Sequence, residues 1–232
     1  MLSDPASTDS AVTRRVASGV VLIVLVAAAV DRCNSSSTAD LGAVRRPAAT
    51  ARLADVDALP VRSRTWTAGY ARDAFGPSWT PGVDAGGDCD TRDVVLARDL
   101  VDVEHADGCT VTRGTLTSPY TGQRVRFVRG PATSPAVQID HLVSLADAWS
   151  AGASRWTAQQ REQFANDPTE LLAVDEDSNQ AKSDHTADQW LPRSPTGRCR
   201  MITAQVAVKT RYRLTVTQSE QAAMRRVLAA CG

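Results

Sequence analysis

The sequence predicts an α+β fold, and three local patterns point to this class. Residues 124–129 alternate between charged and apolar side chains, which is the period of a β-strand with one buried face. Thr157 is followed three residues later by Gln160, and Thr217 is followed at the same spacing by Glu220. This spacing is the capping box that begins many α-helices. Strands and helices are therefore both expected in the folded part of the chain.

The composition limits the class of protein further. The 232 residues are 43% hydrophobic and 22% charged, with 26 basic and 26 acidic side chains. This length leaves room for one globular domain and additional segments. The ordinary apolar fraction excludes a disordered chain, and a single long apolar run excludes a multi-span membrane protein. The balanced charge excludes a uniformly basic nucleic-acid coat.

The charges are unevenly distributed along the chain. Residues 131–190 contain ten acids and three bases, and residues 191–232 contain eight bases and one acid. Their net charges are therefore −7 and +7, while the first 130 residues are balanced. Two interpretations follow: the carboxylates hold a cation while the arginines bind a polyanion, or the two segments neutralise each other in the fold.

The N-terminal region has the pattern of an export signal. Arg14 and Arg15 precede the uncharged run Val16 to Val30, which would be about 22 Å long as a helix and is shorter than the roughly 30 Å hydrocarbon core of a membrane. We interpret residues 1–33 as a signal peptide or, if it is not cleaved, as a membrane anchor. Either alternative predicts a secreted or cell-envelope protein. Membrane contact is then expected only through this segment.

The rest of the chain divides into two expected parts. Residues 34–58 are rich in Ser, Ala and Asp and are expected to be a flexible linker. Residues 59–232 are expected to form the folded domain.

Export changes the expected chemistry of the cysteines. Outside the cytoplasm, Cys89, Cys109, Cys199 and Cys231 can form disulfides. Proximity in the sequence favours Cys89 with Cys109 and Cys199 with Cys231, although four cysteines allow three pairings. A zinc site is the alternative, and the absence of a short Cys-x-x-Cys spacing argues against it.

The first elements of the domain alternate between helix and strand. Residues 90–100 are expected to form a helix, and residues 110–116 a hairpin with 124–129. Val137 and Ile139 continue the alternation of apolar side chains and predict a further strand.

The later elements begin at recognisable caps. A helix is expected from Ala158, after the Thr157 cap, and it should end before Pro168. Residues 171–174 predict a short apolar strand, and Asp175 can cap the helix that follows it.

The chain ends in an amphipathic helix after Thr217. Met224, Val227, Leu228 and Cys231 lie at steps 0, 3, 4 and 7, which is one apolar face. Cys231 should therefore point inward, where a bridge to Cys199 would fasten the end of the chain.

Asp140 and His141 form a candidate catalytic pair at the end of the 137–139 strand. A carboxylate can bind a hard divalent cation, and an imidazole with a pKa of about 6.5 can take a proton from water near neutral pH. An acid and a histidine at the end of a strand can equally be an ordinary hydrogen-bonding pair, so the pair alone does not decide the function.

Asn179 and Lys182 add a second element. They are three residues apart on the predicted helix and therefore share a face. The amide oxygen of Asn179 could complete a metal site, and the ammonium of Lys182 could bind a phosphate. Without Asp140 and His141, both would be ordinary polar helix residues.

Taken together, these elements resemble the ββα-metal core of HNH endonucleases. The order is a strand ending in Asp140-His141, an insertion, the 171–174 strand, and a helix with Asn179 and Lys182. Seven blocks between about Pro60 and Gly232 are more closely similar to secreted bacterial proteins of the DUF1524, HNH endonuclease type. They are Cys89-Asp90-Thr91-Arg92, Pro119-Tyr120-Thr121-Gly122, Gln138-Ile139-Asp140-His141, Phe164-Ala165-Asn166-Asp167-Pro168, Leu171-Leu172-Ala173-Val174, Asn179-Gln180-x-Lys182 and Trp190-Leu191-Pro192.

This resemblance implies a metal-dependent endonuclease. His141 would be the general base that activates water, and Asp140 and Asn179 would hold one divalent ion, Mg²⁺ with Mn²⁺ or Zn²⁺ as alternatives. Lys182 and Arg92 would bind the substrate, a nucleic acid and by expectation DNA, with no stable protein partner implied. The fold would be an HNH-type ββα-metal core with additional helices, a β-hairpin and two disulfides.

One residue departs from the family pattern. HNH proteins usually carry an asparagine before the second strand, where it ties the loop that bears the histidine, and this chain has Glu170. An ionised carboxylate cannot donate a hydrogen bond, so half of that tie would be lost. The alternative function is therefore a non-catalytic exported envelope or nucleic-acid-binding protein with a degenerate HNH site.

Overall fold

The computed structural model describes residues 51, 53–63, 69–81 and 89–231. The predicted export segment, residues 1–33, and most of the predicted linker lie outside the described residues. Within the described part, no helix is long and apolar enough to cross a membrane.

The folded part begins earlier than the sequence analysis expected. Helix α2 (Leu53–Asp57) lies inside the segment predicted to be a linker. Val56 is fully buried, and its carbonyl accepts a hydrogen bond from the side chain of Gln221 at 3.0 Å. The linker prediction is therefore wrong for this helix, because the apolar side chains Val56 and Leu59 pack into the core of the domain.

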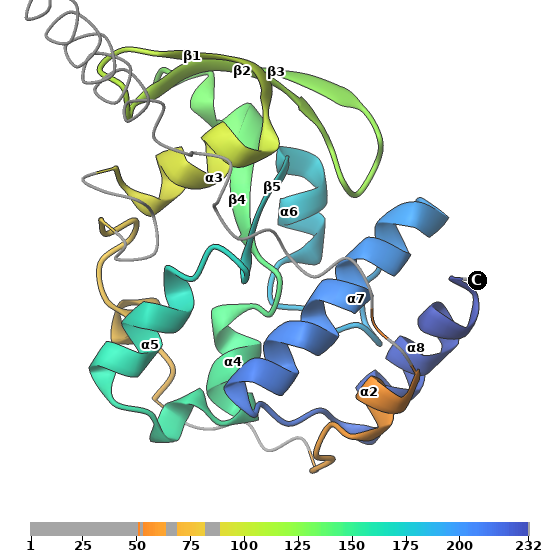
Figure 1. Cartoon of the computed structure of the whole chain (residues 1–232). Helices are drawn as coiled ribbons and strands as arrows, with labels where there is room; N and C mark the ends of the chain where they lie inside the picture. Colours follow the sequence, from red (N-terminus) through yellow and green to blue (C-terminus); the bar gives the residue numbers. More distant parts are fainter. Residues whose placement is uncertain (1–50, 52, 64–68, 82–88, 232) are drawn as a thin grey trace, which may run out of the picture. The chain divides into compact units, whose positions relative to one another are not determined.

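A three-stranded antiparallel sheet forms one part of the domain (Figure 1). Its strands, in spatial order, are β1 (Val101–His105), β2 (Val111–Thr117) and β3 (Arg124–Val128). The β2–β3 hairpin confirms the prediction, whereas β1 was not predicted. Helix α3 (Thr91–Asp99) contacts β2, and its predicted start is confirmed by the side chain of Asp90, which caps it.

A second, two-stranded sheet carries the predicted motif. Strands β4 (Val137–His141) and β5 (Leu171–Asp175) are antiparallel, with His141 opposite Leu171 and Asp140 opposite Leu172. Helix α6 (Glu176–Lys182) follows β5 directly and contacts both strands. The side chain of Asp175 caps α6, as predicted.

The two faces of this sheet line two hydrophobic cores. Val137 and Ile139 of β4 and Ala173 of β5 belong to a core shared with α3, β2 and β3. Leu172 and Val174 point to the other face and belong to a larger core formed mainly by the helices. Neighbouring residues of a strand point to opposite faces. Asp140 and His141 therefore leave β4 on different sides.

The remaining helices enclose the larger core. Helix α5 (Ala158–Ala165) has the predicted capping box between Thr157 and Gln160, and α8 (Gln218–Ala229) begins at the predicted cap Thr217. Helix α7 (Pro195–Tyr212) was not predicted. The short helices are η2 (Arg72–Phe75), η3 (Ser134–Ala136), α4 (Leu145–Ala151) and η4 (Ala153–Arg155).

Both predicted disulfides are present. Cys89 is bonded to Cys109, and Cys199 on α7 is bonded to Cys231 after α8. The second bond fastens the end of the chain to the longest described helix, as expected. Two disulfides agree with the predicted extracytoplasmic location.

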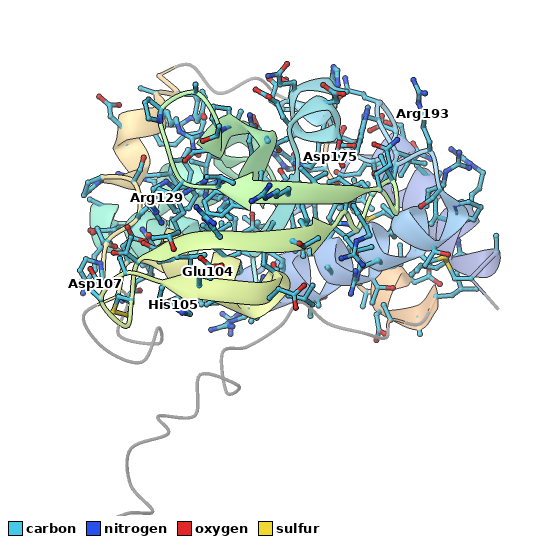
Figure 2. The ribbon with its side chains drawn as sticks, turned by 90° about the horizontal axis from the view of Figure 1, so that it is seen from above. Glu104, His105, Asp107, Arg129, Asp175 and Arg193 are labelled. Atoms are coloured by element: carbon cyan, nitrogen blue, oxygen red, sulfur yellow. A yellow bond between two sulfur atoms is a disulfide. The ribbon has the colours of Figure 1, made fainter. Side chains whose placement is uncertain are left out.

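The acidic and basic segments partly neutralise each other. Lys209 on α7 is fully buried and contacts Asp147 at 2.7 Å and Glu220 at 3.0 Å. Arg211 pairs with Asp167 at 3.1 Å. Arg193, from the basic segment, and Asp175, from the acidic segment, lie toward the same end of the view in Figure 2. These contacts favour the interpretation of mutual neutralisation for this part of the chain.

Candidate active site

His141, at the end of β4, is almost completely buried, with 8% of its surface exposed. Its Nε2 atom lies 3.1 Å from the carbonyl oxygen of Ala165, and its ring stacks on the indole of Trp79 with 6.0 Å between ring centroids and 14° between planes. Both contacts come from segments distant in sequence, one at the end of α5 and one before α3. The imidazole is therefore fixed in position and in orientation.

The contact with Ala165 also defines the protonation of the ring. A carbonyl oxygen only accepts hydrogen bonds, so Nε2 carries the hydrogen, and Nδ1 of the neutral ring keeps its lone pair. Burial, followed by the nearby charge of Arg72, lowers the pKa of His141 to about 3. The ring is then neutral at pH 7, and burial makes Nδ1 a weaker base than the nitrogen of an exposed imidazole.

A small cavity lies beside His141. It is lined by Arg72, Ser78, Trp79 and Asn166 among others, and its volume is about 20 Å³. This volume is enough for about one water molecule. The cavity therefore combines a neutral imidazole, a cation and polar side chains around a space of the size of a water.

Asp140 faces the opposite side of β4 and is also buried, with 4% exposed. Its Oδ1 atom accepts a hydrogen bond from the ammonium of Lys182 at 2.7 Å, and its Oδ2 atom accepts one from the hydroxyl of Tyr120 at 2.6 Å. The ammonium of Lys182 also donates to the carbonyl of His141 at 2.8 Å. Both carboxylate oxygens of Asp140 are thus bound by side chains of the protein.

Asn179 lies one helical turn from Lys182 on the same face of α6. Its Nδ2 atom donates to the side-chain oxygen of Gln138 at 2.7 Å. Gln138 and Asp140 are two residues apart on β4, so both point toward α6. The structure therefore brings the elements that carry Asp140 and Asn179 together, but Asp140, His141 and Asn179 each have different partners.

The donor chemistry of Asp140 and Asn179 suits a hard cation, because carboxylate and amide oxygens are the ligands that Mg²⁺ prefers. The amide of Asn179 uses its nitrogen for Gln138, which leaves its oxygen available. At Asp140, however, the ammonium of Lys182 already compensates the negative charge. A divalent ion would have to replace this ammonium. No cluster of three or more His, Cys, Asp or Glu suited to a metal occurs in the described part of the chain.

The two residues expected to bind substrate have other surroundings. Lys182 has a fully buried side chain, so its ammonium does not face a phosphate in solution. Arg92 on α3 donates to the carbonyl of Val137 at 3.1 Å and lines an open hollow together with Arg129. The phosphate contact expected of Lys182 therefore disagrees with its burial, and Arg92 lies at a hollow that does not include His141.

Glu170 ties the loop that follows His141. Its backbone carbonyl accepts a hydrogen bond from Leu142 at 2.9 Å, and its Oε1 atom accepts one from the amide of Val143 at 3.0 Å. The side chain is fully buried, and burial raises its pKa well above the usual carboxyl range. Burial therefore favours the neutral carboxylic acid, whose O–H could donate a hydrogen bond. The sequence analysis expected Glu170 to lose half of this tie, and that expectation assumed an ionised carboxylate.

The sequence analysis did not identify Arg72 and Trp79 as site residues. Both lie before α3 and reach His141 only through the tertiary fold. Their only local signal is a short stretch that contains Tyr70, Phe75 and Trp79, and such stretches usually mark a core.

The sequence comparisons show the family to which the chain belongs. Residues 90–227, more than half of the chain, match the family model described as GmrSD restriction endonucleases, C-terminal domain. The chain belongs to this family. The GmrSD C-terminal domain region contains Asp140, His141 and Asn179, whereas Arg72 and Trp79 precede it.

A fungal relative covers a larger share of the chain. An uncharacterized secreted protein of Arthroderma benhamiae is 36% identical over 187 residues, which are 80% of this chain and 87% of the relative. No solved structure matches the chain. Membership of the GmrSD family supports a nuclease-type function with a nucleic acid as substrate, and the secreted relative agrees with the extracytoplasmic location.

Proposed function

We propose that the protein is an HNH-type endonuclease that hydrolyses phosphodiester bonds with His141 as the general base. The observation that carries this proposal is the hydrogen bond from Nε2 of His141 to the carbonyl of Ala165. It leaves the lone pair of the neutral ring on Nδ1, and His141 lines a cavity with room for about one water. Membership of a restriction endonuclease family supports the reaction class.

The proposed reaction needs no covalent enzyme intermediate. Nδ1 of His141 accepts a proton from a water molecule, and the oxygen of that water forms a bond to phosphorus. The bond between phosphorus and the leaving oxygen breaks, and the leaving oxygen takes a proton from solvent. The Ala165 carbonyl keeps the ring in the correct orientation and stabilises the imidazolium that forms.

The metal remains part of the proposal. Asp140 and Asn179 are the residues that would hold one divalent ion, Mg²⁺ with Mn²⁺ or Zn²⁺ as alternatives, and it would stabilise negative charge on the phosphate. Binding at Asp140 would require Lys182 to release that carboxylate. Arg92 would contact a more distant part of the nucleic acid, since it lies at a separate hollow.

A nicking assay tests the proposal. Supercoiled plasmid is incubated with the purified protein in Mg²⁺, in Mn²⁺ and in a chelator, beside Asp140→Ala and His141→Ala variants. We expect nicking by the wild type in the presence of a divalent ion, and its loss in both variants and in the chelator. Intact plasmid under every metal condition would contradict the proposal.

The second candidate is a protein that binds nucleic acid without cutting it. In the sequence, Glu170 favoured this alternative, because an ionised carboxylate would weaken the loop after His141. The structure instead gives Glu170 two hydrogen bonds to that loop. Retention of plasmid without cleavage in the same assay would support the second candidate.

A further inference from the structure

Arg72 is a cation at the cavity beside His141, where the proposed reaction takes place. It lines this cavity together with Ser78, Trp79 and Asn166. The side chain is exposed, and no ion pair joins it to any other residue in the part of the chain described. Both lysines of the chain, in contrast, are buried in ion pairs. Arg72 is thus an available positive charge at the cavity.

The backbone that carries Arg72 is firmly held. It belongs to η2, whose last residue, Phe75, is buried among Tyr70, Trp149 and Phe164 with ring centroids 6.2 to 6.5 Å from its own. Arg161 on α5 donates to the carbonyl of Ala74 at 2.7 Å. These contacts fix η2 against α5, so Arg72 is presented from an ordered element.

Trp79 encloses the other side of the imidazole. Its backbone has a φ of 58°, which is unfavourable for a large side chain. The next residue, Thr80, is held by Asn166, whose side chain accepts from its amide at 3.2 Å, and by Thr91, whose hydroxyl donates to its carbonyl at 2.7 Å. The fold therefore maintains an uncommon backbone conformation that places the indole on the ring of His141.

We propose that Arg72 binds the phosphate group that is attacked by the water activated at His141. This inference rests on the proposed nuclease function. A guanidinium offers several N–H donors in one plane and can bind two oxygens of a phosphate at once. Negative charge on these oxygens increases in the transition state, so the contact strengthens during the reaction. Trp79 keeps the imidazole aligned with that phosphate.

Two variants of Arg72 separate charge from geometry. Arg72→Ala removes both, and Arg72→Lys keeps the charge but loses the planar pair of donors. The control is Arg124→Ala on β3, because Arg124 is also exposed and forms no ion pair within the described residues. Unfolding curves of all three variants should match that of the wild type, since exposed side chains without partners contribute little to stability.

The first measurement is the rate of plasmid nicking. We expect kcat/KM to fall about 100-fold or more in Arg72→Ala, mainly through kcat, because loss of a transition-state donor typically costs this much. Arg72→Lys should be intermediate, and Arg124→Ala should remain within about twofold of the wild type. Equal rates in Arg72→Ala and the wild type, or equal losses in Arg72→Ala and Arg124→Ala, would overturn the inference.

The second measurement is independent of cleavage. Binding of a fluorescent DNA duplex is measured in a chelator at several salt concentrations. The slope of log K against log salt changes by about 0.9 for each phosphate contact in duplex DNA. We expect the slope of Arg72→Ala to be shallower than that of the wild type by about 0.9, which corresponds to the loss of one phosphate contact. If the wild type does not cut DNA at all, the proposed function fails, and the slope alone then decides whether Arg72 contacts a phosphate. An unchanged slope in Arg72→Ala would overturn the inference about Arg72.

Discussion

The ammonium of Lys182 lies 2.7 Å from a carboxylate oxygen of Asp140, and both side chains are almost completely shielded from solvent. This ion pair joins α6 to β4 directly beside His141, and the hydroxyl of Tyr120 occupies the second carboxylate oxygen. The residue expected to bind a metal and the residue expected to bind a phosphate are therefore partners of each other. Their interaction holds together the ββα arrangement on which the proposed site depends.

Lys182→Met is expected to destabilise the protein strongly. The substitution leaves the carboxylate of Asp140 buried without its counter-charge, which typically costs about 3–5 kcal/mol. Urea unfolding of the variant and the wild type measures the difference. The double variant Lys182→Met with Asp140→Asn should lose clearly less than the sum of the single changes. Additive losses would show that the two side chains are not coupled.

The same substitution tests the proposed metal site. Without the ammonium of Lys182, Asp140 and Asn179 are free to hold a divalent ion, and an ion that binds only the folded protein raises its stability. We expect millimolar Mg²⁺ or Mn²⁺ to raise the melting temperature of Lys182→Met more than that of the wild type. Adding Asn179→Ala to Lys182→Met should reduce the gain. A metal response equal in all three proteins would contradict the assignment of these ligands.

Relative to the wild type, the Glu170→Gln variant is expected to become more stable as the pH rises. Burial raises the folded-state pKa of Glu170 above its unfolded value of about 4.3. Its contribution to stability is therefore complete below that value and is lost as the pH rises toward the folded pKa. Glutamine is neutral at every pH and keeps an acceptor for the amide of Val143.

The measurement is urea unfolding of Glu170→Gln and the wild type at pH 5 and pH 8. Relative to the wild type, the variant should gain free energy of unfolding between the two values. The control is Glu104→Gln, because Glu104 is exposed on β1 beside His105 and Asp107 (Figure 2). A pH response of Glu170→Gln no different from that of the control would show that Glu170 is ionised in the folded protein.

The elements that the sequence predicted correctly are those with local signals. The caps Thr157, Asp175 and Thr217 begin helices as expected, and the alternation of apolar residues located β3 and β4. Helix α7 was missed because residues 201–206 are all buried, so no single apolar face marks it. Strand β1 was missed because it is an edge strand with mostly exposed side chains.

The site residues were also predictable only where they form a local motif. Asp140, His141, Asn179 and Lys182 were identified because they occur as a motif with short spacings. The partner of each was not predictable, because an ion pair between β4 and α6 or a ring stacked on His141 depends on contacts between residues far apart in the sequence. The sequence could likewise not show that Glu170 is buried, which is what raises its pKa.

The C-terminal disulfide should contribute substantially to stability. The loop between Cys199 and Cys231 spans 32 residues, and closing a loop of this size in the unfolded chain corresponds to about 3–4 kcal/mol. Cys199→Ser with Cys231→Ser removes the bond without leaving a free thiol. We expect guanidinium unfolding at a lower concentration in this double variant than in the wild type. An unchanged midpoint would show that α7 and α8 are held together by packing alone.

The rate of plasmid cleavage by wild type and His141→Gln, compared at saturating enzyme in Mg²⁺, tests the central claim most directly. Glutamine can still donate to the carbonyl of Ala165, so it preserves the packing of a residue that is 8% exposed better than alanine does. Loss of a general base typically slows a reaction by 10²–10⁴-fold. We predict cleavage by the wild type and a rate at least about 100-fold lower in the folded variant. Cleavage by His141→Gln at the wild-type rate would contradict the assignment of His141 as the base.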